Sequence, residues 1–136
     1  MSRTKLWLGV LLAAVLLLAA GWLWGASGRW AAQADQQNAR LRLQVAEARS
    51  ALTGARVDVY ERNFGQASRH LEQAKTSLRQ AASALEAAGR NDEAAAVNDA
   101  LARAVKAQQL AGGVDQAANS EAAEALKILD RVNLER

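Results

Sequence analysis

His70 and a few serines are the side chains of this sequence that could support catalysis. His70 is the only histidine, and the chain has no cysteine. A serine hydrolase needs its serine on a sharp turn, with a histidine base within reach. The candidate serines instead lie in alanine-rich, helical contexts: Ser50, Ser68, Ser77, Ser83 and Ser120. The sequence therefore predicts a noncatalytic protein, with His70 on the surface of a helix.

Metal binding has no clear sequence signal either. Without cysteine or a second histidine, a metal site would have to be built from carboxylates alone. The aspartates and glutamates are scattered along the chain, and no group of them has the spacing of a ligand set. We therefore expect no metal and no other cofactor.

The distribution of charge argues against a nucleic-acid partner. The formal net charge is +3, and Arg3 and Lys5 supply two of these charges. In the rest of the chain, acidic and basic residues are interspersed. This pattern is typical of a solvated helical surface, whereas nucleic-acid binding needs a basic patch.

An uncharged segment near the N-terminus predicts a membrane anchor. Residues 6–26 contain no charged side chain and follow Arg3 and Lys5. As a helix this segment is about 31 Å long, enough to cross the hydrocarbon core of a bilayer. Indole rings favour the headgroup zone, so we expect the four tryptophans near the two ends to mark the membrane interface. They are Trp7, Trp22, Trp24 and Trp30.

A secretory signal peptide is the alternative interpretation of this segment. Cleavage after Ser27 would then release a secreted helical protein. The length of the apolar run and the bulky residues 22–24 favour an uncleaved anchor. Arg3 and Lys5 favour a cytoplasmic N-terminus, although Arg29 on the other side weakens that bias. We therefore expect a single-pass membrane protein whose C-terminal domain is extracytoplasmic, which in a bacterium means periplasmic.

The remaining chain predicts an all-α domain. It has no proline and is rich in alanine, the strongest helix former. Breaks at Asn63–Gly65, Gly89–Asn91 and Gly112–Gly113 divide it into helices. The expected helices are about 30–62, 66–88, 92–111 and 115–134. The expected organisation is a head (1–5), an anchor (6–26), a juxtamembrane stalk (27–40) and an antiparallel bundle of about four helices (41–136).

Apolar residues at alternating spacings of three and four give the helices a packing seam. The most regular seam is in the second helix, where we expect Leu71, Leu78 and Leu85 to be buried among alanines. In the anchor, Gly21 and Gly25 have the spacing of a membrane helix-packing motif. Large apolar residues are few after the anchor, so the core is thin and association with itself or with another protein is expected.

The first helix is expected to be longer than its neighbours. Its membrane-proximal end would then extend beyond the bundle and leave Leu41 and Leu43 exposed. We expect association through this part of the helix.

One segment resembles a tetratricopeptide repeat. The run Asn63-Phe64-Gly65-Gln66-Ala67, continuing through Leu71 and Ala74, is similar to the turn and second helix of that repeat. The preceding helix departs from the repeat at Gly54 and Asp58, and no second copy follows about 34 residues later. The resemblance implies a peptide-binding groove lined by the first and third helices. Two ordinary helical hairpins are the alternative.

The sequence thus predicts a noncatalytic, membrane-anchored helical interaction or scaffold module. A tetratricopeptide-like peptide-binding domain and a cleaved secreted helical protein are the two alternatives. The expected partners are the lipid bilayer and either another protein or a second copy of the chain.

Overall fold

The computed structural model describes residues 3–132 and 134, with side chains from Gln33 onward and at a few earlier positions. Every element of the described chain is a helix: α1 (Arg3–Tyr60), α2 (Phe64–Ala87), α3 (Asn91–Gly112) and α4 (Ala117–Leu129). The chain divides into two compact units, residues 1–37 and 38–136. The predicted all-helical fold, with a bundle of four helices, is confirmed for the described residues.

Most side chains of the predicted anchor, residues 6–26, lie outside the described part of the structure. Its backbone belongs to α1, which is helical from Arg3 to Tyr60. Among the described residues, no helix combines the length and the apolar character that a membrane span requires.

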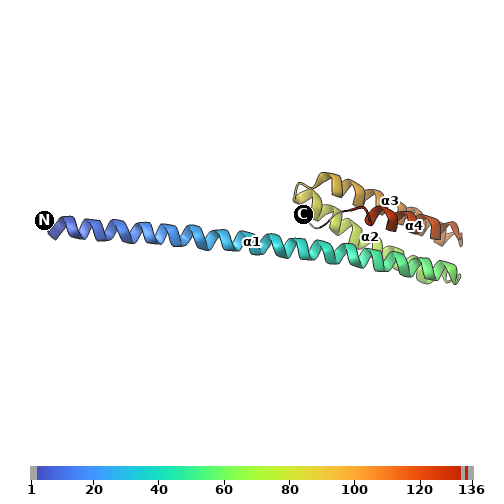
Figure 1. Cartoon of the computed structure of the whole chain (residues 1–136). Helices are drawn as coiled ribbons and strands as arrows, with labels where there is room; N and C mark the ends of the chain where they lie inside the picture. Colours follow the sequence, from blue (N-terminus) through green and yellow to red (C-terminus); the bar gives the residue numbers. More distant parts are fainter. Residues whose placement is uncertain (1–2, 133, 135–136) are drawn as a thin grey trace. The chain divides into compact units, whose positions relative to one another are not determined.

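From Asn38 onward, the four helices lie alongside one another in a bundle (Figure 1). The link between α1 and α4 closes it: Arg49 Nη2 donates to the carbonyl oxygen of Leu129 at 2.6 Å, and Arg56 Nε donates to Asn119 Oδ1 at 2.9 Å. The later residue of α1 contacts the earlier residue of α4, so the two helices are antiparallel. This closure favours a four-helix bundle over the open stack of a tetratricopeptide array, in which each repeat contacts only its neighbours.

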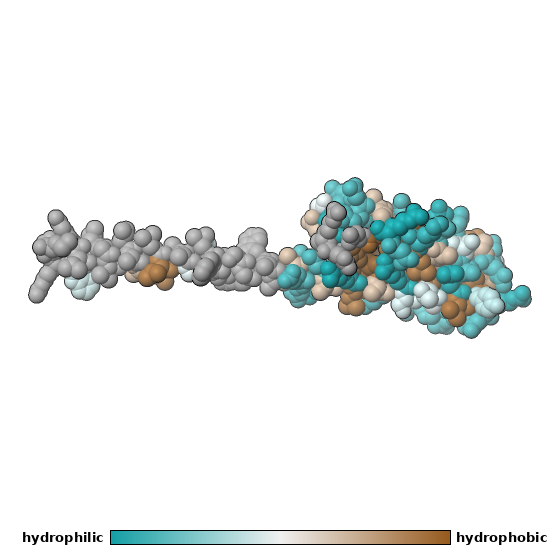
Figure 2. Space-filling model, viewed as in Figure 1, coloured by the Kyte–Doolittle hydropathy of each residue, from teal (hydrophilic) through white to brown (hydrophobic). Residues whose placement is uncertain are grey.

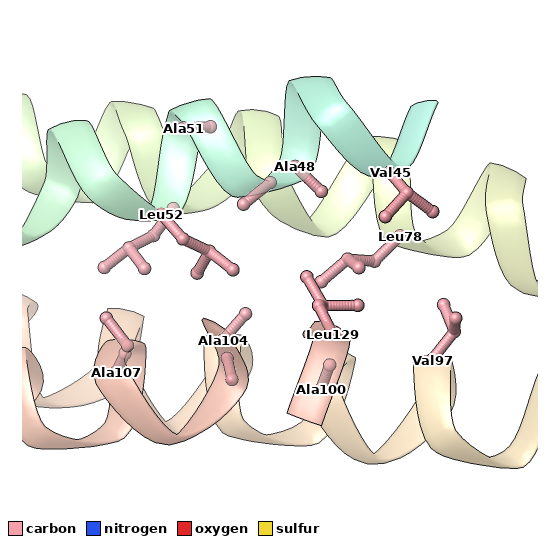
Figure 3. Close-up of a cluster of buried hydrophobic side chains, with 14 of the residues drawn as sticks. Val45, Ala48, Ala51, Leu52, Leu78, Val97, Ala100, Ala104, Ala107 and Leu129 are labelled. Atoms are coloured by element: carbon pink, nitrogen blue, oxygen red, sulfur yellow. The ribbon is translucent and has the colours of Figure 1, made fainter. Parts of the chain in front are cut away.

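The core of the bundle consists of alanines and a small number of larger apolar side chains. In Figure 3, Leu78 of α2 lies close to Val45 of α1, Val97 of α3 and Leu129 of α4. Alanine occupies most of the other buried positions, which lets the helix axes approach one another. No polar or charged residue is buried in the described part of the chain. The largest fully buried side chains are Leu52, Leu71, Leu78, Leu85, Leu129, Val45, Val59 and Val97.

The three helix–helix connections share one backbone device. After α1, α2 and α3, a residue with positive φ turns the chain: Arg62 at 61°, Gly89 at 71° and Val114 at 60°. The next backbone N–H then donates to a carbonyl near the end of the preceding helix, as Asn63 N does to Asp58 O at 2.7 Å. Only Gly89 is the residue type expected at this position. A β-branched valine there is strained.

One predicted helix end and the predicted exposure of Leu41 are wrong. The fourth helix ends at Leu129, short of residue 134, where Arg49 binds its last carbonyl, and the chain then runs on toward Arg42 of α1 outside any helix. Val132 is buried and Leu134 packs on the core, while Arg42 Nε donates to the Leu134 carbonyl oxygen at 3.3 Å. Leu41 belongs to the same core and is only 4% exposed, contrary to expectation.

The core predicts the effect of a charge at Leu78. Leu78→Asp places an unpaired carboxylate among apolar side chains and removes a large core residue, so we expect a loss of at least about 4 kcal/mol in unfolding free energy. Thermal and urea unfolding of the full chain in detergent would measure it. Ala84→Asp, at an exposed position of the same helix, is the matched control. Equal unfolding curves for the two variants would contradict this packing.

Candidate interaction surface

The face of α1 that points away from the core carries an uncharged stripe. Its positions are separated by three and four residues and all are exposed: Leu43, Ala46, Ser50, Thr53, Val57 and Tyr60, called here the outer stripe. Leu43 is 59% exposed, Val57 52% and Tyr60 83%. Each stripe position except Tyr60 lies two residues, or about 200° around the axis, from a buried residue. The bundle part of α1 therefore has two faces with helix-packing periodicity, of which one fills the core.

Charged residues of opposite sign border the outer stripe. On the side of α4 lie Arg42, Arg49 and Arg56, at heptad spacing. On the side of α2 lie Glu47, whose carboxylate accepts from Ser77 Oγ at 3.5 Å, and Glu61 two heptads later. Apolar positions with such flanks are typical of a helix that packs against another helix.

A shallow groove runs beside the stripe, between α1 and α2. Its volume is about 800 Å³. Gln44 Nε2 donates to Gln80 Oε1 at 3.4 Å across the same helix pair. Most residues that line the groove have polar side chains, including Glu47, Ser50, Gln73, Thr76, Ser77 and Gln80. Figure 2 shows that hydrophilic residues dominate one face of the bundle, with hydrophobic residues in separate spots.

His70 joins α2 to α1 through a contact with Asp58. Nδ1 of the imidazole lies 2.7 Å from Oδ2 of Asp58, and the two side chains are 29% and 13% exposed. Gly54 makes room for the ring, because a Cβ at that position would lie 3.0 Å from both Nδ1 and Cε1 of His70. His70, expected on the surface, is therefore a half-buried packing residue.

The His70–Asp58 pair does not by itself form a catalytic site. A hydrolase needs a nucleophile hydrogen-bonded to the second ring nitrogen and a set of donors for the oxyanion. Ser77, in the groove nearby, donates its hydroxyl to Glu47. In the described chain, no cluster of three or more acidic or histidine side chains could hold a metal ion.

Two further carboxylates bind basic side chains and link helices of the bundle. Hydrogen bonds from Lys106 and Arg103 lower the pKa of Glu121, and the bond to Glu121 raises the pKa of Arg103. These bonds join α3 to α4. Hydrogen bonds from Lys75 and from Gln108 of α3 lower the pKa of Glu72. Both carboxylates hold helices together, and Glu72 also lines the groove beside the outer stripe.

None of the residues predicted from the sequence as sites belongs to the outer stripe. Leu71, Leu78 and Leu85 are fully buried and pack α2 into the core. Trp7 is 73% exposed and Trp22 75%. Gly21 has open space where a Cβ would be. Trp24, Trp30 and Gly25 lie outside the described side chains.

Sequence reasoning missed both the outer stripe and the His70–Asp58 contact. A second series of three- and four-residue spacings in α1 was visible, but the stronger series through Leu41, Val45 and Leu52 took precedence. Gly54 and Asp58, one helical turn apart where apolar residues were expected, were the available signal for the His70 contact.

The comparisons with known proteins found no matching family model, no matching curated protein and no matching solved structure.

The fit of His70 against Gly54 predicts a coupling between these two positions. Gly54→Ala alone should give no gain in stability, because the new methyl group displaces the imidazole from Asp58. In a His70→Ala background, the same change should stabilise the chain by about 0.8 kcal/mol through helix propensity. Thermal unfolding of the four chains in detergent measures the coupling. Additive effects would show that Gly54 does not serve the histidine.

Proposed function

We propose that this chain is a noncatalytic, single-pass membrane protein whose helical bundle binds a protein partner outside the cytoplasm. The outer stripe of α1 is the observation that carries this proposal. It is uncharged over its whole length, although all of its positions are exposed. A face that served only for solubility would be expected to carry charges there.

The way in which the bundle is held together supports the same proposal. The core already accounts for the inner face of α1, so the outer stripe is not needed to bury the chain's own apolar residues. The tetratricopeptide alternative is less well supported, because the groove it implies would use faces of α1 and α3 that contribute to the core, such as Val45 and Val97.

The membrane part of the proposal rests on residues 6–26 and their flanking charges. We expect the full chain to remain in membranes after alkaline extraction and a variant lacking residues 6–26 to be released, because only the apolar segment can hold the chain in the bilayer. A reporter fused after Arg136 should be active only outside the cytoplasm. A mature N-terminus at Gly28 would instead establish the secreted alternative.

Site-specific photocrosslinking tests the surface. A photoreactive amino acid at Thr53 of the full chain, in intact membranes, should give a discrete protein adduct, because this position lies in the middle of the outer stripe. Ala102, exposed on α3, is the control position and should give none. The absence of a Thr53 adduct, or equal adducts at both positions, would contradict the proposed function.

A further inference from the structure

We propose that the outer stripe binds a second copy of this chain, forming a parallel two-stranded coiled coil between two α1 helices. This inference rests on the proposed function and names its partner. The surface involved is residues 43–60, the part of α1 whose inner face is already packed in the bundle.

The stripe has the pattern of a coiled-coil seam of moderate strength. Leu43, Ser50 and Val57 occupy one type of core position at intervals of seven, and Ala46, Thr53 and Tyr60 occupy the other. Leucine, valine and tyrosine supply the apolar area, and the small residues in the middle allow two helices to approach closely. The polar hydroxyls of Ser50 and Thr53 weaken the seam, so free chains should associate weakly.

The flanking charges select a second copy in parallel orientation. In a parallel pair, a residue on the arginine border of one helix faces the residue five positions further along on the partner helix. Arg42 of one copy then faces Glu47 of the other, and Arg56 faces Glu61. Each interaction occurs twice by symmetry, while Arg49 faces Gly54. The pairing therefore has no like-charge contact over residues 42–61.

An antiparallel pair has the opposite electrostatics. Flanks from the same side of the stripe then face each other, so the arginines at positions 42, 49 and 56 oppose arginines of the second copy. Like charges across such an interface oppose that arrangement. The intrachain contacts of Arg42 and Arg56 each use only Nε, and an arginine has further N–H donors for a carboxylate.

The proposed anchor compensates for the weakness of the seam by keeping two chains close together in the membrane. Two chains held in one membrane with the same topology are confined to a thin layer and already run in the same direction. Confinement of this kind raises the effective concentration of a second binding surface without any new contact. The parallel orientation selected by the charges is the one that the shared membrane imposes.

Disulfide crosslinking of the full chain in membranes tests this inference directly, because the chain has no cysteine of its own. Ala46→Cys and Val57→Cys, each alone, should give a disulfide-linked dimer on mild oxidation. Self-pairing near both ends of the stripe requires a parallel arrangement, since an antiparallel one would pair position 46 with position 57. Ala102→Cys on α3 is the exposed control. Equal dimer at Ala102 would indicate random collision and overturn the inference.

Charge reversal tests the specificity. Two variants of the Ala46→Cys chain are compared. In the first, Glu47→Lys with Glu61→Lys replaces both acidic border residues with lysine. In the second, Arg42→Glu with Arg56→Glu replaces two border arginines with glutamate. Each variant alone should lose dimer by roughly tenfold. When the two are expressed together with different tags, the mixed dimer should return, because each basic flank then faces an acidic one. Circular dichroism should show that both variants remain folded.

The outcomes separate this inference from the proposed function. A Thr53 photoadduct whose mass equals two copies, together with the recovered mixed dimer, supports both. An adduct with a different protein and no dimer at positions 46 and 57 retains the proposed function and overturns self-association. No adduct and no dimer would overturn both.

Discussion

Close packing of helices across alanine is the constraint on which this bundle depends. The core contains no buried polar or charged residue among the described positions, so no buried ion pair fixes how the helices are paired. Their relative positions follow from the shapes of a few leucines and valines set among alanines. A core of this kind tolerates little change in volume, because alanine-lined contacts leave no flexible side chain to adjust. Larger apolar residues outside it are correspondingly few, which makes those on the outer stripe conspicuous.

Polar contacts at the edges of α1 complement this core by fixing the rotation of the helix about its own axis. On one edge, His70 fits against Gly54 and its Nδ1 contacts Asp58 at 2.7 Å. On the other edge, Arg49 binds the end of α4 through the carbonyl oxygen of Leu129. A shift of one residue turns a helix by about 100°, which would break both sets of contacts at once. The two edges therefore keep the same face of α1 directed outward.

Periodicity was sufficient to predict the parts of the fold that depend on local sequence. The regular spacing in α2 predicted a helix with Leu71, Leu78 and Leu85 on one face, and Gly89 marked a true helix end. Contacts distant in sequence were not predictable in this way. The end of α4 depends on Arg49, which is 80 positions away, and Leu41 is buried in the core that Val132, beyond the end of α4, also joins. Arg62 and Val114 adopt positive φ because of where the helix carbonyls need donors, not because of their residue types.

The same limitation explains why the outer stripe was not recognised from the sequence. Two stripes with the same spacing run along α1, and spacing alone cannot tell which one faces the core. The inner stripe has the better apolar residues, whereas the outer one includes serine and threonine. Burial assigns the inner stripe to the bundle and leaves the outer one exposed. Once the outer stripe is known to be exposed, the charged residues beside it can be assigned to its two borders. Arginine on one border and glutamate on the other match a second, identical helix running in the same direction.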